Sequence, residues 1–245
     1  MGIFKAMELV ASGKTFADQC EILNCLLRYP KVLKKPVMIH NEFGDFYFPI
    51  DYNVWQSSTR SRLKLFKEFN IKRGTFIDVG AMIGKYSLMV SRNPKINVIA
   101  IEPAKDNFEV LKGNIQLSQR ENITPMNIAL SDNDEIQTFY INEKHGSNSL
   151  LLKTDRQTKI QCLKLDTLKD QINLRNIKLI KIDVEGAEVN VVKGCLEIIK
   201  EFSPKFIIEI SCQKNLKEIT HLLKGYSVYN VDHDDYCFVK EGKYQ

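Results

Sequence analysis

The sequence predicts an α/β fold built on a seven-stranded, mostly parallel sheet. From residue 75 onward, short apolar segments alternate with longer segments whose apolar residues recur at helical spacing. This alternation is typical of parallel strands that are covered by helices on both faces. The last two apolar segments, residues 226–231 and 236–240, are separated by a short polar turn, so we expect an antiparallel C-terminal hairpin at one edge of the sheet.

The same patterns predict the other elements of this domain. Further strands of the main sheet are expected at residues 75–79, 97–101, 123–129, 178–183 and 205–211, and two strands around a polar loop at residues 136–141 and 159–163. Helices are expected at residues 84–92, 106–117, 187–201 and 215–223.

Residues 1–73 lack the alternation of apolar strands and helices seen from residue 75 onward. They predict a helical and hairpin cap that packs on the main domain, residues 74–245. No linker rich in Pro, Gly or Ser separates the two segments. Within the cap we expect a helix at residues 16–27, a hairpin at residues 37–48 with its turn at residues 42–45, and a helix at residues 58–69.

The composition is that of an ordinary globular domain. The chain has 245 residues, of which 44% are hydrophobic and 27% charged, and its formal net charge is +5. The basic residues are dispersed among acidic ones, so no nucleic-acid partner is expected. Six cysteines without a Cys-x-x-Cys pair favour reduced thiols over a structural zinc site. Because no signal sequence or membrane-spanning apolar run is visible, we expect a cytoplasmic protein; the oligomeric state, including a homodimer, is left open.

Candidate binding residues follow the first strand, because ligands of open α/β sheets bind at the carboxyl ends of the strands. The loop at residues 78–84 has glycines at positions 80 and 84 but lacks the Gly-x-Gly-x-x-Gly pattern of a dinucleotide site. Its acidic start favours a cationic or amino-bearing ligand such as S-adenosylmethionine. We expect Asp78, Gly80, Ala81 and Gly84 to bind this cofactor.

The next two strands are followed by candidates for binding the adenosine part of such a cofactor. Glu102 lies roughly 20 residues beyond the glycine loop, where a carboxylate accepts hydrogen bonds from two ribose hydroxyls. Ser131 and Asp132 are expected near the adenine ring, with a simple turn role as the alternative.

Later strands add further carboxylates. Asp183 ends the strand at residues 178–183 and is expected to face the reacting methyl group, and strand alternation would place Glu185 on the same side. Glu188 is expected to stabilise the start of the following helix. Glu209 lies inside an apolar strand and is a candidate for the wall of the site, because a buried carboxylate needs a partner or a cavity.

Together these blocks resemble the FkbM family of methyltransferases. The matching segments are residues 76–88, 101–103, 129–132, 146–150, 165–168 and 180–188. The resemblance covers about residues 74–211 and implies a class I, Rossmann-like methyltransferase fold. It also implies S-adenosylmethionine-dependent methylation, mostly of hydroxyl oxygens on sugars, polyketides and related metabolites. By the resemblance, Asp78, Gly80 and Glu102 bind the cofactor and Asp132 lies near adenine. One position departs from the family, which usually has Asn where this chain has Met82.

Methylation of an alcohol predicts a base or a cation near the acceptor oxygen, since a protonated hydroxyl is a poor nucleophile. Asp183 is the first candidate, either as the base or as a ligand to a divalent cation such as Mg²⁺, although no metal-ligand spacing is visible. His145 is the second because histidine titrates near neutrality, with a solvated loop residue as the alternative. Glu185 is the third. The expected acceptor is a small molecule or a glycan.

Three other interpretations stay open. A nicotinamide-dependent oxidoreductase would share the Glu102 arrangement but needs the missing glycine pattern. Met82 is compatible with a non-catalytic S-adenosylmethionine-binding protein on the same scaffold. RNA methylation is the third, and it predicts RNA binding that depends on salt.

Overall fold

The computed structural model describes residues 68–141, 150–151, 156–172 and 174–242, together with the backbone of residues 37–41 and 44–48. The expected helix at residues 16–27 lies outside the described residues, as do residues 58–67 of the expected helix at residues 58–69 and His145. The expected N-terminal hairpin is present as β1 (Val37–Asn41) paired antiparallel with β2 (Gly44–Phe48).

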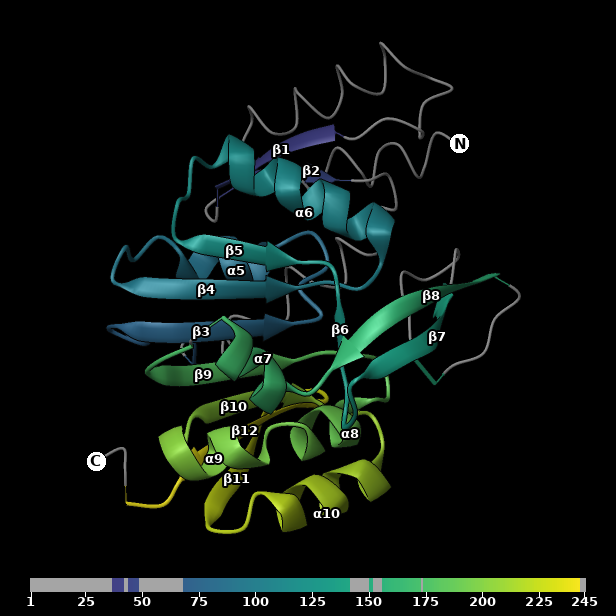
Figure 1. Ribbon diagram of the computed structural model, residues 1–245. Helices are drawn as coiled ribbons and strands as arrows, with labels where there is room; N and C mark the ends of the chain where they lie inside the picture. Colours follow the sequence, from purple (N-terminus) through teal and green to yellow (C-terminus); the bar gives the residue numbers. More distant parts are fainter. Residues whose placement is uncertain are drawn as a thin grey trace, which may run out of the picture.

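A seven-stranded sheet forms the centre of the molecule (Figure 1), in the order β11-β12-β10-β9-β3-β4-β5. Its strands are β3 (Gly74–Val79), β4 (Ile96–Ile101), β5 (Ile123–Met126), β9 (Ile177–Ile182), β10 (Lys205–Glu209), β11 (Tyr226–Asp232) and β12 (Asp235–Lys240). The five strands from β10 to β5 are parallel, and β12 is antiparallel to both β10 and β11. The predicted mostly parallel sheet with an antiparallel C-terminal hairpin is therefore confirmed.

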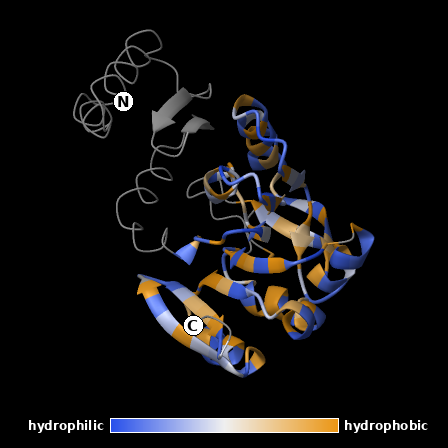
Figure 2. Cartoon of the chain, turned by 90° about the vertical axis from the view of Figure 1, so that its left-hand side faces the viewer, coloured by the Kyte–Doolittle hydropathy of each residue, from blue (hydrophilic) through white to orange (hydrophobic). Residues whose placement is uncertain are grey.

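Alternating side chains of the central strands divide the core into two layers. Ile77, Ile180 and Ile208 face one side, where they pack with apolar residues of α7 (Leu165–Gln171), α8 (Glu188–Lys193), α9 (Leu196–Phe202) and α10 (Gln213–Leu222). Phe76 and Ile207 face the other side with residues of α5 (Lys85–Val90) and α6 (Lys105–Leu117). Figure 2 shows hydrophobic segments along the central strands and mixed colouring along the helices, as two-sided covering requires. Among the described residues, no helix combines the length and apolar character that a membrane crossing requires.

One expected strand is divided between the main sheet and a small second sheet. The segment predicted as a single strand at residues 123–129 divides into β5, which ends at Met126, and β6 (Ala129–Leu130). β6 leaves the main sheet and pairs with β8 (Arg156–Leu163), which also pairs with β7 (Glu135–Ile141). Asn127 lies at this change of direction, and its side chain bonds the end of the neighbouring strand instead of continuing the ladder.

One expected helix is divided in two next to a close backbone contact. The segment predicted as a helix at residues 187–201 is two helices, α8 and α9, which are separated at Gly194 and Cys195. A Cβ atom on Gly194 would lie 2.1 Å from the carbonyl oxygen of Ser131, so only glycine fits there. Helix α7 was not expected, although its apolar residues Leu165 and Leu168 are fully buried.

A bulge sets the register between β3 and β9. Thr75 lies opposite Ile177, whereas Phe76 lies opposite Leu179, so Lys178 is an extra residue on β9. Beyond the bulge, Asp78 lies directly opposite Lys181. Side chains opposite each other in a ladder share a face of the sheet, so the ammonium and the carboxylate are on the same side.

Candidate functional site

Three of the predicted carboxylates meet at the carboxyl edge of the sheet, which is the right-hand edge in Figure 1. Asp78 is the fifth residue of β3, Glu102 follows β4, and Asp183 follows β9. These strands are adjacent and parallel, so their carboxyl ends lie together. The charge of Asp183 contributes to raising the pKa of both Asp78 and Glu102, which places the three groups within electrostatic range of one another.

Glu102 organises the loop next to it. Its Oε1 accepts hydrogen bonds from the Ala104 N–H at 2.9 Å and from Asn107 Nδ2 at 3.4 Å, and its Oε2 accepts one from the Met82 N–H at 2.8 Å. The side chain is nearly buried, with 4% exposed. Burial is the main cause that raises the pKa of Glu102 to about 7, against the three hydrogen bonds, which lower it.

Several N–H groups of the glycine loop donate hydrogen bonds to carbonyl groups of the chain. The amides of Gly80 and Ala81 both donate to the carbonyl of Ile101, at 3.0 and 2.9 Å, and the amide of Gly84 donates to the carbonyl of Ala81 at 2.8 Å. The Met82 amide is bonded to Glu102. The N–H groups of these four residues are thus bonded within the chain and are not free to cradle a phosphate.

The two glycines permit close packing on both sides of this loop. Gly80 has φ 79°, and a Cβ atom there would lie 1.8 Å from the carbonyl oxygen of Asp183. Gly84 has φ 93°, and its Cβ would lie 2.6 Å from Leu111 Cδ1 on α6. Asn114, also on α6 and fully buried, donates from Nδ2 to the carbonyl of Ile83 at 2.7 Å. The loop is therefore held between β9 and α6.

Met82 has a left-handed backbone with φ 51°. This region is unfavourable for most side chains but is well tolerated by asparagine. The departure from the family's usual residue therefore concerns backbone conformation as well as the side-chain hydrogen bond expected from the sequence.

Asp78 lies beneath the loop and has no exposed surface. Its Oδ2 accepts a hydrogen bond from Ser87 Oγ of α5 at 2.7 Å, and its Oδ1 has no hydrogen-bond partner among the described residues. Burial is the main cause that raises the pKa of this carboxyl group. Asp78 thus ties β3 to α5 and contributes negative potential to the site from below.

Asp183 forms the partly exposed wall of the site. Its side chain is 26% exposed, and Oδ2 lies 2.9 Å from the Nζ of Lys181, whose side chain is 2% exposed. Two positions further on, Glu185 is exposed in a turn with φ 52°. Because β9 ends at Ile182, strand alternation does not extend to Glu185, and the same-side expectation, which applied only to a strand continued that far, is not tested.

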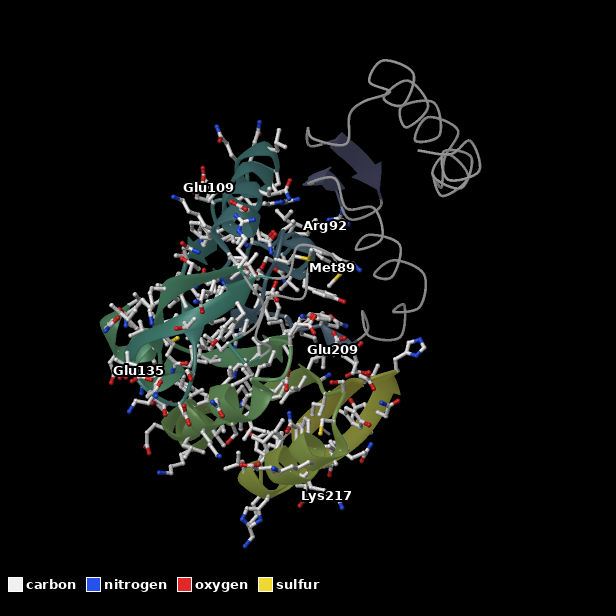
Figure 3. The ribbon with its side chains drawn as sticks, turned by 90° about the vertical axis from the view of Figure 1, so that its right-hand side faces the viewer. Met89, Arg92, Glu109, Glu135, Glu209 and Lys217 are labelled. Carbon is white, nitrogen blue, oxygen red and sulfur yellow. The ribbon has the colours of Figure 1, made fainter. Side chains whose placement is uncertain are left out.

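Two further acidic residues line this edge. Glu188 is the first residue of α8, where its Oε1 accepts from the Gly186 N–H at 2.6 Å and its Oε2 from Asn215 Nδ2 at 3.3 Å, so it stabilises the helix start as expected. Glu209 is half-buried at the end of β10, directly after Ile208, which pairs with Ile182 of β9. Figure 3 looks onto this carboxyl edge and labels Glu209.

Ser131 and Asp132 lie elsewhere on the carboxyl side, after β6. The buried Ser131 donates its N–H to the carbonyl of Leu163, and its own carbonyl packs against Gly194. Asp132 is exposed and lies within electrostatic range of Lys193, the last residue of α8. The pKa of Lys193 is raised mainly by a hydrogen bond to Glu218, and the charge of Asp132 raises it further. The structure shows no contact between these two residues and Glu102.

Asn127 lies next to Glu102. Its Nδ2 donates to the carbonyls of Glu102 at 2.8 Å and Pro103 at 2.9 Å. Sequence reasoning gave no role to Asn127, nor to Lys181 and Asn107. Their signals were present: Asn127 directly follows a main strand, Asn107 lies in the first turn of α6, and Lys181 shares a strand face with Asp183.

The described residues add no metal site to this arrangement. Within those parts of the chain, no group of three or more His, Cys, Asp or Glu side chains is placed to hold a metal ion. The expectation of Mg²⁺ therefore gains no support.

Comparison with known proteins identifies the family of this chain. Residues 78–228 match the family described as "Methyltransferase FkbM domain". A hexuronic acid methyltransferase, AglP, of Haloferax volcanii is 27% identical over 146 residues, which are 60% of this chain and 59% of the relative. A protein named methyltransferase 1 of Beauveria bassiana is 26% identical over 142 residues, 48% of this chain and 57% of the relative. The chain thus matches less than two thirds of the length of either relative.

A solved structure supports the same fold. The crystal structure of a methyltransferase FkbM from Methylobacillus flagellatus superposes with a TM-score of 0.52 at 18% identity, covering 96% of this chain and 58% of that one. The family match spans more than half of this chain, from Asp78 at the first strand end to Val228 in β11. The chain therefore belongs to the FkbM methyltransferase domain family.

Proposed function

We propose that this protein transfers a methyl group from S-adenosylmethionine to a hydroxyl oxygen of a sugar or another small metabolite. One observation carries the proposal: the strand ends gather three carboxylates around a loop in which the N–H groups of Gly80, Ala81, Met82 and Gly84 are bonded within the chain. Such a site attracts a cation and repels a diphosphate. The adenosyl sulfonium is a cation, whereas a nicotinamide dinucleotide carries a pyrophosphate that needs donor groups.

The residues present fit this cofactor. Glu102 has a nearly buried carboxylate beside a strand end, where it would accept hydrogen bonds from ribose hydroxyls. Asn127 holds the backbone beside Glu102, on the side where adenine would be recognised. The cofactor supplies the activated methyl group, and the protein supplies alignment and a path for the acceptor's proton.

Asp183 is the residue that would meet the acceptor. It is the partly exposed carboxylate at the end of β9, and its Oδ2 lies 2.9 Å from the Lys181 Nζ. We propose that it accepts a hydrogen bond from the acceptor hydroxyl and so directs the oxygen lone pair toward the methyl group. The curated relative named for methylating hexuronic acid supports a sugar acceptor.

Binding and turnover test the proposal separately. Isothermal titration should show binding of S-adenosylhomocysteine and none of NADH; NADH binding with no response to S-adenosylhomocysteine would favour the oxidoreductase. Turnover is then measured with S-adenosylmethionine and a panel of sugars, with methylated product detected by mass spectrometry.

Asp183→Asn tests the catalytic assignment. It should lower turnover at least about a hundredfold while S-adenosylhomocysteine affinity changes less than about threefold. Asp170→Asn, an exposed position on α7, is the matched control and should behave as the unaltered protein. Undiminished turnover in Asp183→Asn contradicts the role of Asp183. Cofactor binding without turnover on any acceptor would instead indicate a non-catalytic binding protein.

A further inference from the structure

Lys181 is a buried lysine at the centre of the site that the proposed function leaves unexplained. Its side chain is 2% exposed, and its ammonium lies 2.9 Å from Asp183 Oδ2 and 4.8 Å from the centre of the Tyr86 ring. The Tyr86 ring also stacks on Phe69, with centroids 4.8 Å apart and planes 9° apart. Asp78 lies directly opposite Lys181 in the ladder between β3 and β9. The ammonium therefore forms an ion pair with Asp183, lies over an aromatic ring and is within electrostatic range of Asp78.

Acidic groups surround the Asp183 carboxylate on the other sides. The charge of Asp183 acts on Asp78 of β3, on Glu102 after β4 and on Glu188 of α8, and in each case it raises the neighbour's pKa. Glu209 of β10 follows Ile208, which pairs with Ile182 on the neighbouring strand. On α5, Tyr86 faces Lys181. Among these groups only Lys181 carries a positive charge.

Resting on the proposed function, we propose that Lys181 is a positioning residue: its ammonium fixes the orientation of the Asp183 carboxylate and keeps it ionised among its acidic neighbours. Only an ionised and oriented carboxylate accepts the hydrogen bond of the acceptor hydroxyl. Like charges at short range otherwise favour uptake of a proton by one of them. Lys181 acts through Asp183 and does not itself touch the acceptor.

The pH dependence of turnover tests this role. In Lys181→Met, Asp183 loses its counter-ion, so the acidic limb of the kcat/KM profile should move to higher pH by about one to two units. Lys181→Arg keeps the positive charge, and its acidic limb should stay within about half a unit of the unaltered protein, even if the rate falls. A purely structural role would lower the rate at all pH values or lower the Tm, without moving the limb in Lys181→Met alone.

A binding measurement gives a second result that does not need turnover. Sinefungin carries an amine in place of the methylsulfonium group, whereas S-adenosylhomocysteine has no charge at that atom. In the unaltered protein, the ratio of the two affinities should change by less than about threefold between about pH 6 and pH 8, because the ionisation of Glu102, with a pKa of about 7, affects both proteins alike. In Lys181→Met, the preference for sinefungin should fall about tenfold toward the acidic end, as Asp183 takes up a proton.

The outcomes separate the two proposals. If the unaltered protein binds neither nucleoside, the proposed function fails. If it binds both, and Lys181→Met has the same pH dependence as the unaltered protein, the role of Lys181 is wrong while the proposed function stands. If Lys181→Met does not fold, Lys181→Gln takes its place, and a limb shifted in Lys181→Arg as far as in Lys181→Gln also overturns the proposal.

Discussion

The Met82 N–H donates a 2.8 Å hydrogen bond to Glu102 Oε2, and this bond joins the turn after β3 to the end of β4. The carboxylate proposed to bind ribose therefore also fixes the loop that borders the cofactor. Binding and loop conformation are coupled through one side chain, and changes at either residue should affect both.

The stability of the protein should report the ionisation of Glu102. Its pKa is raised to about 7 from an ordinary 4.5, so the folded state holds a proton that the unfolded chain releases between these values. The free energy of unfolding should then fall by about 3 kcal/mol as the pH rises through this window. Urea unfolding between about pH 5 and pH 7.5 measures the slope, which should be weaker in Glu102→Gln. Equal slopes in the two proteins would show that Glu102 ionises normally; Glu109→Gln, an exposed site on α6, is the control.

Replacing Met82 by Asn should stabilise the loop. At φ 51° the methionine backbone is strained, and asparagine adopts this conformation more easily. We expect Met82→Asn to raise the free energy of unfolding by about 1 kcal/mol and to leave S-adenosylhomocysteine binding intact or tighter. The comparison is Met89→Asn, in α5 and similarly half-buried, which should gain nothing. Loss of stability at position 82 would mean that apolar contacts of Met82 outweigh the strain.

Two glycine substitutions should have opposite effects. Gly80→Ala would place a Cβ atom 1.8 Å from the Asp183 carbonyl oxygen in a left-handed backbone, so it should cost more than about 3 kcal/mol or prevent folding. Gly113→Ala adds a Cβ that meets nothing within 4 Å, inside α6, and should stabilise the protein by about 0.5–1 kcal/mol. Thermal unfolding of both variants provides the measurement, and a mild effect at Gly80 would contradict the tight packing of the loop on β9.

Asn127→Ala should loosen the end of β4. The substitution removes two hydrogen bonds to the Glu102 and Pro103 carbonyls, which should lower stability by about 1–2 kcal/mol and weaken S-adenosylhomocysteine binding about tenfold. Asn133→Ala removes side-chain bonds near β7, away from this strand end, and should leave binding unchanged. Equal binding by the two variants would remove Asn127 from the site.

Much of the fold was predictable because the central strands are continuous apolar runs that end at Gly, Pro or acidic residues. β3, β4, β9 and β10 lie within one or two residues of their expected bounds. The errors occur where distant backbone decides the outcome. The break between α8 and α9 depends on the Ser131 carbonyl, more than sixty positions away in the sequence, and no local pattern reports such a contact.

The sequence predicts which residues lie at the carboxyl ends of the parallel strands, and this much of the site could be predicted. Asp78, Glu102 and Asp183 could be expected at one edge because each ends a parallel strand. What each carboxylate contacts could not be read from the sequence, since hydrogen bonding depends on the loop path. The bond from Met82 to Glu102 and the complete burial of Asp78 follow from the way the turn folds back over β3.

The extra residue at Lys178 has a consequence for the whole site. Continued without it, the ladder that pairs Thr75 with Ile177 would set Asp78 opposite Ile180, and the ammonium of Lys181 would move out of phase with that carboxylate. Deletion of Lys178, roughly 10 Å from the acidic edge, would thus change which charged side chains lie opposite each other without altering any residue at that edge. The register between β3 and β9 therefore determines the chemistry of this site as much as the side chains themselves do.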